Sequence, residues 1–433
     1  MSAEMRVRRA DGAVIADVRV PPSKSLTNRA LVCAALADGT SEVHGVAPGD
    51  DSAAMLECLE LLGCDVDLTS DDGERTATIG GLDGEIAPRA ERLPTRLAGT
   101  TSRFITAVAA LGHTPLTIDG DPPLRERPMG PLHDSLVALG ARLEPGGRPG
   151  HLPATVTGPL RGSDGIVMPG NVSSQYVSAL MMIAPYLPGG LRLGLSTELV
   201  SRPYVELTGS VMSAFGASPP EVSARRITVT EGRYVGTEFR VEPDASSASY
   251  PLAAAALVGG AVSVRHLGAR SAQGDAGFAD VLARMGCITV VSDHDTVVMR
   301  RRDTPLRGID IDMSDISDLV PTVAVVATQA VTPTRITGVG FIRHKESDRL
   351  GDLAAELAKC GADVTVERDG LLIRPTDLLS GARLETHHDH RLAMAFGILG
   401  LAVDGIEVAD PDVVAKSWPS FWEALAEIPA RRP

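Results

Sequence analysis

The segment MLECLELLGCDVDL, residues 55–68, has the form of an amphipathic helix that ends at Gly63 and is followed by a strand. Apolar residues at helical spacing precede the glycine, and alternating apolar and polar residues follow it. A glycine at this place supplies the left-handed residue with which many helices end before the chain turns away. The segment therefore predicts one unit made of a helix, a glycine and a strand.

The same pattern occurs four more times along the chain. The further copies are LHDSLVALGARLE (132–144), LTGSVMSAFGASPPEV (207–222), FADVLARMGCITVV (278–291) and LAAELAKCGADVTV (353–366). From Gly63 to Gly140, Gly216, Gly286 and Gly361 the intervals are 77, 76, 70 and 75 residues. Six units of about 72 residues account for the 433 residues, and the sixth is expected at residues 418–428 without its glycine. A break near residues 241–243 favours two lobes of three units each over one solenoid.

Composition excludes several classes of protein. Asp and Glu number 55 against 41 Lys and Arg, so the net charge of −14 argues against a nucleic-acid-binding surface. No apolar run reaches the ~18 residues of a membrane span, and the charged first residues do not form a secretory signal. The five cysteines are odd in number and show no CxxC pair, which predicts unpaired thiols and a cytoplasmic protein.

Polar or basic clusters stand just before seven apolar helical runs. The seven starts are PPSKSLTNRA, AGTTSRFITA, NVSSQYVSAL, PDASSASYPL, KESDRLGDLA, HHDHRLAMAF and AKSWPSFWEA. Each alone is consistent with an ordinary helix cap. Together with their Lys and Arg residues they predict that helix N-termini bind a small, multiply charged anion. The chain has only four lysines, Lys24, Lys345, Lys359 and Lys416, which either reflect codon bias or mark places that require a compact ammonium.

Several of these clusters also suggest chemistry. Lys24, Ser25 and Arg29 lie within one helical turn and can grip a phosphate or carboxylate, but the GxxxxGK[ST] pattern of ATP sites is absent. Glu346 lies in an alternating charge run, and Asp315 and Asp318 both precede a strongly apolar run. Each is a candidate for proton transfer, although an exposed charge run is the simpler explanation for the first. The histidines of residues 387–390 are adjacent and have no partner cluster, so no metal site is expected.

Taken together and in order, these motifs resemble the 5-enolpyruvylshikimate-3-phosphate (EPSP) synthase family of enolpyruvyl transferases. The resemblance covers residues 21–421 and rests on the following motifs: Lys24-Ser25-x3-Arg29, Ala-Gly99-Thr with Arg103, Arg127-Pro128, Ser173-Ser174-Gln175, Ser201-x-Pro-Tyr204, Asp-Ala-Ser-Ser-Ala-Ser-Tyr250, Lys345-Glu346-x-Asp348-Arg349, Asp389-His390-Arg391 and Lys416. It implies an α/β fold, a two-lobed inverse α/β barrel of six βαβαββ repeats with three repeats in each lobe. Residues 23–242 would form the first lobe and residues 1–22 plus 243–433 the second, with the active site in the interlobe cleft.

The resemblance also implies the reaction. The enolpyruvyl group of phosphoenolpyruvate would pass to the 5-hydroxyl of shikimate 3-phosphate with release of phosphate, in the shikimate pathway that leads to chorismate and the aromatic amino acids. The implied ligands of shikimate 3-phosphate are Lys24, Ser25, Arg29, Ser173, Ser174, Gln175, Ser201, Asp318 and Lys345. The implied ligands of phosphoenolpyruvate are Lys24, Gly99, Arg127, Gln175, Arg349, Arg391 and Lys416. Asp318 fits the base that takes the hydroxyl proton, Glu346 fits the acid that protonates C3, and Lys24 is the third catalytic residue. No cofactor or metal, no partner beyond the two substrates and a monomeric, cytoplasmic enzyme are expected.

Two positions depart from the family pattern, and two alternatives stay open. Leu97 and Phe341 stand where the family often has asparagine, which affects expected contacts near the phosphoenolpyruvate and shikimate ligands. The first alternative is a UDP-N-acetylglucosamine enolpyruvyl transferase, but that enzyme uses a loop cysteine and residues 112–131 contain none. The second is a non-catalytic anion-binding protein on the same scaffold, which would have no use for Asp318 and Glu346 as carboxylates.

Overall fold

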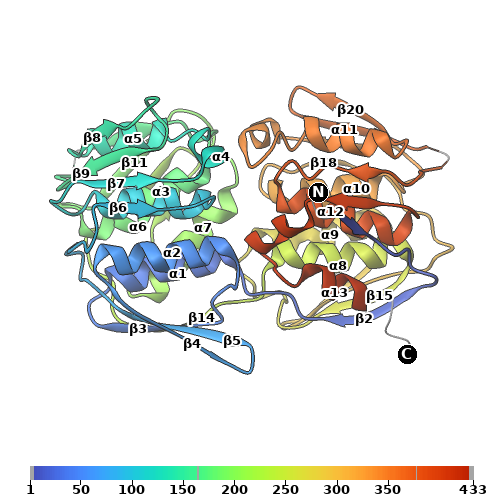
Figure 1. Cartoon of the computed structure of the whole chain (residues 1–433), viewed down its shortest axis with the longest axis horizontal. Helices are drawn as coiled ribbons and strands as arrows, with labels where there is room; N and C mark the ends of the chain where they lie inside the picture. Colours follow the sequence, from blue (N-terminus) through green and yellow to red (C-terminus); the bar gives the residue numbers. More distant parts are fainter. Residues whose placement is uncertain (1–3, 163–164, 377, 429–433) are drawn as a thin grey trace. The chain divides into compact units, whose positions relative to one another are not determined.

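The computed structural model describes residues 4–162, 165–376 and 378–428, which form two compact units (Figure 1). Unit 1 combines the described parts of Met1–Pro21 and Pro243–Pro433, and unit 2 spans Pro22–Glu242. Each unit buries its own apolar core, and among the described residues no core residue is shared between the two. Unit 2 is thus one continuous stretch of chain, whereas unit 1 is built from two stretches.

Unit 2 contains three four-stranded sheets in the described part of the chain. The first sheet has the spatial order β14 (Glu238–Arg240), β3 (Thr40–His44), β5 (Glu74–Gly80) and β4 (Asp65–Asp71). The second has the order β6 (Arg92–Pro94), β7 (Leu116–Asp119), β9 (Ala154–Thr157) and β8 (Arg142–Pro145). The third has the order β10 (Ile166–Met168), β11 (Leu191–Leu195), β13 (Arg226–Val229) and β12 (Glu221–Val222).

Unit 1 contains two four-stranded sheets and one three-stranded sheet among its described residues. The first four-stranded sheet has the spatial order β2 (Val14–Val18), β15 (Gly260–Val264), β17 (Thr296–Arg300) and β16 (Ile288–Val291). The second has the order β18 (Asp310–Asp312), β19 (Thr334–Thr337), β21 (Gly370–Arg374) and β20 (Asp363–Glu367). The three-stranded sheet has the order β22 (Arg383–Leu384), β23 (Glu407–Ala409) and β1 (Glu4–Arg6).

The pairing of the strands repeats from sheet to sheet. In each four-stranded sheet the first pair is parallel and the other two pairs are antiparallel, as in β6 with β7, β7 with β9 and β8 with β9. The three-stranded sheet keeps the parallel pair β22 with β23 and the antiparallel pair β1 with β23. Because the full pattern appears five times and a shortened form once in the described residues, the periodicity seen in the sequence corresponds to repeated sheet units.

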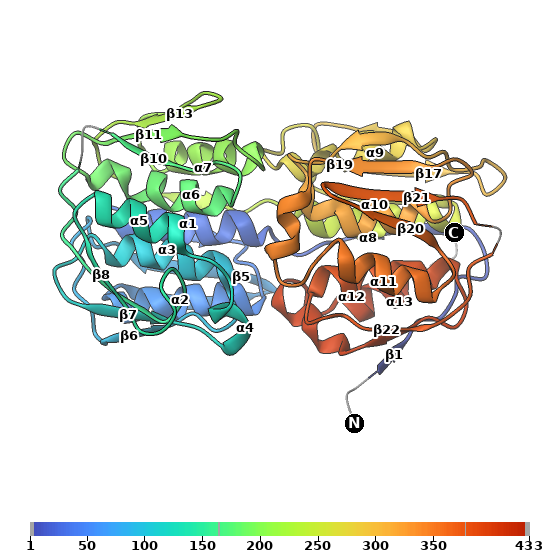
Figure 2. The same ribbon diagram turned by 90° about the horizontal axis from the view of Figure 1, so that it is seen from above.

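Three helices are buried in each unit and pack against one another. They are α1 (Lys24–Leu36), α3 (Gly99–Ala109) and α6 (Ser174–Ile183) in unit 2, and α8 (Ala245–Val258), α10 (Val320–Ala327) and α12 (His390–Ala402) in unit 1 (Figure 2). Every residue of α3 and of α8 is buried. In α8 this follows from a sequence that is small or apolar on all sides, since a helix without a polar face must be surrounded by protein. In α3 the one charged residue, Arg103, is buried with its guanidinium donating to the Gly99 carbonyl.

The remaining helices are amphipathic or short. The amphipathic ones are α2 (Asp50–Leu62), α5 (Gly130–Ala138), α7 (Arg202–Ala214), α9 (Phe278–Arg284), α11 (Gly351–Lys359) and α13 (Phe421–Glu427). The short ones are α4 (Pro122–Arg125) and the 3-10 turns η1 (Ala184–Tyr186), η2 (Gly274–Gly277), η3 (Ser317–Leu319), η4 (Gly340–His344) and η5 (Pro411–Lys416). No helix in the described residues is long and apolar enough to cross a membrane.

The glycines that end five of the amphipathic helices have the predicted left-handed backbone. Their φ angles are 115° at Gly63, 104° at Gly140, 89° at Gly216, 101° at Gly286 and 87° at Gly361. A side chain is strained in this region, so glycine is the residue that turns each helix into the following strand at least cost. The strand that follows each glycine, from β4 to β20, is also present as predicted.

Candidate active site

Most of the predicted site residues lie at or just before the N-terminal ends of the buried helices. In unit 2 these are the starts of α1, α3 and α6, and in unit 1 the starts of α10 and α12. The first turn of a helix leaves backbone N–H groups without partners inside the helix and carries partial positive charge. The fold therefore places the predicted ligands where the backbone already favours an anion.

Lys24 is the first residue of α1 and forms an ion pair. Its Nζ lies 3.1 Å from Oδ2 of Asp51, a buried residue in the first turn of α2. The cap residue Ser23 accepts a hydrogen bond from the N–H of Leu26, which fixes the start of the helix. Ser25 is half-buried beside them. The ammonium is thus held at a helix start, with an exposed fraction of 15%.

The Arg29 guanidinium is enclosed by protein groups, with only 1% of the residue exposed. It donates to the Thr208 hydroxyl at 2.7 Å, to the Ser25 carbonyl at 2.8 Å, and to Ser178 Oγ and the Tyr204 carbonyl at 3.3 Å each. Burial lowers the pKa of Arg29 to about 10, which leaves it charged at neutral pH. Arg29 therefore joins α1 to α6 and α7 and orients Ser25.

Gly99, the first residue of α3, lies against two guanidinium groups. A Cβ at this position would lie 2.5 Å from Arg127 Nη1 and 2.6 Å from Arg103 Nη1. Arg103 also donates to the Gly99 carbonyl at 2.6 Å. Only glycine leaves room for both cations at this helix start, so the predicted role of Gly99 as a place of close approach has a geometric basis.

Helix α6 begins beside α3. Gln175 Nε2 donates to the Thr100 hydroxyl at 3.1 Å, which links the first turns of the two helices. Ser173 caps α6 by accepting from the Gln175 N–H, and Ser174 is buried. Ser201 precedes α7 with a φ of 53° and is 3% exposed. A serine in this strained region is typical of functional sites, because surrounding structure must hold it there.

In unit 1 the predicted charged residues meet around Arg349, which is 1% exposed. Its guanidinium donates to three carboxylates: Asp318 at 2.8 Å, Glu346 at 2.8 Å and Asp389 at 2.7 Å. Asp389 also caps α12 by accepting from the Arg391 N–H at 2.9 Å. The loop that carries Glu346 and the start of α12 are therefore tied together by one buried arginine.

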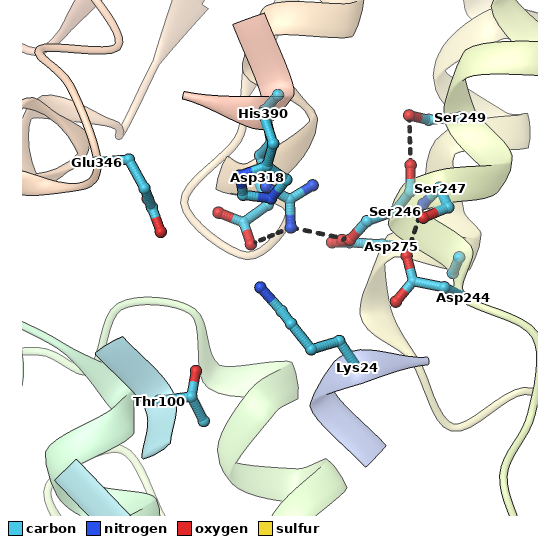
Figure 3. Close-up of polar contacts among 12 residues, drawn as sticks. Lys24, Thr100, Asp244, Ser246, Ser247, Ser249, Asp275, Asp318, Glu346 and His390 are labelled. Carbon is cyan, nitrogen blue, oxygen red and sulfur yellow. Dashed lines mark hydrogen bonds and ion pairs between the residues drawn. The ribbon is translucent and has the colours of Figure 1, made fainter. Parts of the chain in front are cut away.

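Two further cations extend this group. Arg391 Nη2 donates to Asp318 Oδ2 at 2.7 Å, and Lys416 Nζ lies 3.3 Å from Glu346 Oε1. Three cations, Arg349, Arg391 and Lys416, thus alternate with the carboxylates of Asp318, Glu346 and Asp389. Figure 3 shows Asp318 and His390 together at this site. We refer to these six residues as the unit 1 charge cluster.

The cluster has a strong effect on ionisation. Burial alone would raise the pKa of Asp318, but the positive charges of Arg391, Lys345 and Arg349 outweigh burial and hold that pKa well below its usual range. Burial alone would lower the pKa of Arg349, whereas its three carboxylate partners raise it. Asp318 is therefore ionised over the whole physiological range, as a proton acceptor must be before the reaction.

The two departures from the family pattern have different surroundings. The ammonium of Lys345 lies 5.9 Å from the centre of the Phe341 ring, a cation–π contact. An asparagine there would offer a hydrogen bond, and the ring instead offers its negative face to the lysine. Leu97 is 43% exposed and lies just before α3.

Three residues outside the predicted ligand and catalytic sets also belong to these sites, although two of them, Arg103 and Asp389, are part of the sequence motifs. Asp51 pairs with Lys24, Arg103 approaches Gly99, and Asp389 anchors both Arg349 and α12. Asp389 stands immediately before an apolar helix, so its capping position was a usable signal. Arg103 lies one turn after Gly99 on α3, so its approach is a local property of that helix, whereas Asp51 reaches Lys24 only through tertiary packing, which no local pattern reveals.

The histidine tract of residues 387–390 forms no metal site in the described part of the chain, where no group of three or more His, Cys, Asp or Glu is arranged to hold an ion. His387 Nε2 instead lies 3.0 Å from Glu356 Oε1. The tract shapes the loop before α12, with His387 and His388 both at positive φ.

The family model for EPSP synthase (3-phosphoshikimate 1-carboxyvinyltransferase) matches residues 9–425. The chain belongs to the EPSP synthase family. A 3-phosphoshikimate 1-carboxyvinyltransferase from Methanosphaerula palustris is 41% identical to it, over 94% of this chain and 95% of the relative. A second, from Methanoculleus marisnigri, is 42% identical, over 96% of this chain and 97% of the relative. An EPSP synthase structure from Acinetobacter baumannii matches with a TM-score of 0.83 and 27% identity, covering 98% of both chains.

These similarities confirm several predictions. The six-repeat α/β fold is that of an EPSP synthase, and the chain is an enzyme, a 1-carboxyvinyl transferase of the shikimate pathway. The alternative of a non-catalytic anion-binding protein is thereby set aside. Membership of the EPSP synthase family does not by itself decide which residues bind each substrate and move each proton.

Proposed function

We propose that this enzyme transfers the enolpyruvyl group of phosphoenolpyruvate to the 5-hydroxyl of shikimate 3-phosphate. The proposed ligands of shikimate 3-phosphate are Lys24, Ser25, Arg29, Ser173, Ser174, Gln175, Ser201, Asp318 and Lys345. The proposed ligands of phosphoenolpyruvate are Lys24, Gly99, Arg127, Gln175, Arg349, Arg391 and Lys416. Among them Arg29 acts chiefly by orienting Ser25, since its own donors are taken by protein acceptors.

Anionic substrates would replace the ion pairs that the cations make within the protein. Lys24 is paired with Asp51, and Lys416 with Glu346, so each ammonium is held in place before the substrate arrives. Groups held in this way need little rearrangement on binding, which is how preorganised charges assist a reaction. Phosphate and carboxylate groups suit both the forked guanidinium of arginine and the compact ammonium of lysine.

The reaction needs one proton removed and one added. Oxygen of the 5-hydroxyl forms a bond to C2 of phosphoenolpyruvate while C3 takes a proton, which gives a tetrahedral ketal. The hydroxyl proton leaves to a base. Cleavage of the C2–O bond to phosphate and loss of a proton from C3 then give the enol ether and inorganic phosphate. Positioning and electrostatics, together with one acid and one base, are sufficient for this sequence.

Asp318 is the proposed base and Glu346 the proposed acid. With a pKa held far below neutral, Asp318 accepts a proton poorly while Arg391, Lys345 and Arg349 surround it. Binding of anions to the same cations weakens their hold on Asp318 and raises its pKa toward a useful value. Phosphoenolpyruvate that engages Lys416 and Arg349 likewise competes with Glu346 for its two cationic partners, which favours the protonated form that an acid requires.

The cysteines give no support to the alternative acceptor UDP-N-acetylglucosamine. All five thiols are buried, and burial raises the pKa of Cys33, Cys58 and Cys64 to about 12 and that of Cys287 and Cys360 to about 11. A buried neutral thiol is unsuited to proton transfer at a solvent-filled site. The unpaired thiols also support our proposal that the enzyme works in the cytoplasm, and we propose that it does so as a monomer.

The observation that carries the proposal is the unit 1 charge cluster, in which Asp318 and Glu346 both contact the buried Arg349. The test is phosphate release from phosphoenolpyruvate with each acceptor in turn. Release that requires shikimate 3-phosphate and does not occur with UDP-N-acetylglucosamine is expected. Release with the nucleotide sugar, or with neither acceptor, would overturn the assignment.

A further inference from the structure

A buried carboxylate outside the proposed ligand set lies behind Arg391. Asp275, in η2, is 4% exposed and accepts a short hydrogen bond from the Ser246 hydroxyl. Ser246, in the first turn of α8, also accepts from Arg391 Nη2 at 3.4 Å. Figure 3 shows Asp275 beside Ser246, with dashed contacts leading on toward Asp318.

The direction of these hydrogen bonds is fixed by chemistry. A guanidinium can only donate, so Ser246 Oγ accepts from Arg391 and must turn its own hydrogen to Asp275. The same Nη2 donates its other hydrogen to Asp318 at 2.7 Å. Arg391 is therefore held from two sides, by Asp318 directly and by Asp275 through Ser246.

Asp275 is itself held firmly in place. In the same loop, the Gln273 side chain accepts from the Ala245 N–H at 3.0 Å and donates to the Pro243 carbonyl at 2.8 Å. These bonds pin η2 to the start of α8, the helix that carries Ser246. A carboxylate fixed to η2 is thus connected, through the Ser246 hydroxyl, to an arginine on another element, α12.

We infer that Asp275 is a positioning residue for phosphoenolpyruvate, which orients Arg391 through the Ser246 hydroxyl. The inference rests on the proposed contact of Arg391 with phosphoenolpyruvate. A fixed guanidinium binds a carboxylate or phosphate with less loss of freedom than a mobile one. Shikimate 3-phosphate, to which Arg391 is not assigned, should be bound equally well without Asp275.

The charge on Asp275 supplies a second measurable property. The pKa of Asp275 is raised to about 6, chiefly by burial and then by the negative charge of Asp318. Arg391 and the hydrogen bond from Ser246 act in the opposite direction, and Asp244 adds a smaller increase. The adjoining helix α9 adds no facing charge, since Asp280 is exposed and Arg284 donates to the Asp310 carbonyl. Asp275 is thus ionised at neutral pH and becomes neutral in mildly acidic solution.

The test compares Asp275→Asn, Ser246→Ala and the double variant with the wild type. The matched control is Asp280→Asn, the same change of charge on an exposed residue five positions away. Each single variant at the relay should raise the KM for phosphoenolpyruvate by about tenfold, the scale of a hydrogen bond to a charged group, and leave the KM for shikimate 3-phosphate unchanged. Because both residues act through one chain of bonds, the double variant should be no worse than the single ones by more than about twofold.

Two further readouts separate positioning from simple support of the fold. The first is the kcat/KM of the wild type divided by that of Asp275→Asn, a ratio in which the titration of the substrates cancels. As the pH drops from about 7.5 to about 5.5, Asp275 becomes neutral like the amide, so this ratio should fall toward one. Asp275→Asn should also keep or raise Tm at neutral pH. A carboxylate whose pKa is raised on folding costs stability above its unfolded pKa, and the amide removes that cost.

Three outcomes would overturn the inference: relay variants indistinguishable from Asp280→Asn, losses that multiply in the double variant, or a common rise in both KM values with a lower Tm. Arg391→Lys distinguishes failure of the inference from failure of the proposed function. If that variant leaves the KM for phosphoenolpyruvate unchanged, the proposed role of Arg391 is wrong. If it raises that KM while Asp275→Asn does not, only the role of Asp275 is wrong.

Discussion

At the scale of single residues, the members of the unit 1 charge cluster differ in burial, and the proposed acid and base are more exposed than the arginine that they contact. Arg349 is buried and contacts three carboxylates, so removing one partner would leave an uncompensated charge in the interior. Asp318 and Glu346 are each partly open, with side-chain exposed fractions of 18% and 14%. These two carboxylates can reach a substrate without exposing the buried arginine.

Asp318→Asn and Glu346→Gln should each lower kcat by about 100-fold or more, the scale of a positioned acid or base. Glu346 is not a proposed ligand of shikimate 3-phosphate, so Glu346→Gln should leave the dissociation constant of that substrate unchanged. Asp318→Asn keeps only one of the two oxygens that accept from Arg349 and Arg391, so it should also weaken the binding of shikimate 3-phosphate. Calorimetric titration measures that constant, and phosphate release measures kcat.

The proposed acid can be tested by following one proton. During turnover in heavy water, Glu346→Gln should take up deuterium at C3 of phosphoenolpyruvate much more slowly than the wild type. Uptake at the wild-type rate would remove Glu346 as the acid and leave Lys24 or Asp318 as the proton source.

Lys24→Arg and Lys416→Arg should not be conservative. Arginine is longer than lysine, and its planar guanidinium presents a fork of donors where Asp51 and Glu346 now face one compact ammonium at 3.1 Å and 3.3 Å. Each change is expected to lower kcat/KM by at least tenfold, or about 1.4 kcal/mol.

Lys359 is not a neutral control for this experiment. Its Nζ lies 2.6 Å from the buried Glu356, which also contacts His387 in the loop before α12. Arg8→Lys is a better control, since Arg8 and its partner Asp11 are 85% and 87% exposed. Wild-type kcat/KM in both Lys24→Arg and Lys416→Arg would mean that the scarcity of lysine carries no functional information.

The sequence predicted which residues lie at the sites better than it predicted which groups each side chain contacts. The motif residues Lys24, Gly99 and Arg349 stand at helix starts or in charged loops that local patterns reveal. Arg29 has the same local signal, but its donors face Thr208 and Ser178 on other helices. These contacts join residues that are 179 and 149 positions apart, so they depend on tertiary packing and could not be predicted from spacing.

At the scale of elements, the glycine at the end of each amphipathic helix has a predictable cost of replacement. Gly286 has a φ of 101° and open space around it, with no atom closer than 3.5 Å to an added Cβ. Gly286→Ala should therefore lower the free energy of unfolding by about 1–2 kcal/mol from backbone strain alone. Chemical denaturation measures this change.

Gly63→Ala should cost more than Gly286→Ala. In addition to a φ of 115°, a Cβ at Gly63 would lie 2.4 Å from the Ala87 carbonyl oxygen. Gly277→Ala is the control, because Gly277 has a φ of −61° and no atom within 4 Å of an added Cβ. A control variant as unstable as Gly63→Ala would contradict the argument from backbone conformation.

The elements were easier to predict than their exact partners. The helix–glycine–strand pattern located α2, α5, α7, α9 and α11 because amphipathic periodicity and a left-handed glycine are both local properties. The sixth repeat lacks the glycine, and its sheet has three strands instead of four in the described residues. Its strand β1 comes from the start of the chain, a pairing that no local pattern could reveal.

At the scale of the whole molecule, the cysteines should be inert in the native enzyme. All five are buried, and their pKa values are raised to about 11 or 12 by burial. Since thiolates are the reactive form, an alkylating reagent at neutral pH should neither label the folded chain quickly nor reduce phosphate release. In denaturant all five should react. Rapid loss of activity on alkylation of the native enzyme would reopen the cysteine-dependent alternative.

The division of the chain between the units has a consequence for the order in which the protein can form during synthesis. All strands and helices of unit 2 lie within Pro22–Glu242, so that unit is complete when little more than half of the chain has been made. In unit 1, β2 must wait for β15 at Gly260–Val264, and β1 must wait for β23 at Glu407–Ala409. Domains fold as units while the ribosome adds about 5–20 residues per second, so β1 and β2 stay unpaired for many seconds after they leave the ribosome. A newly made chain therefore passes through a stage in which one unit is folded and two edge-forming strands are exposed, and this is the stage at which chaperones should bind it.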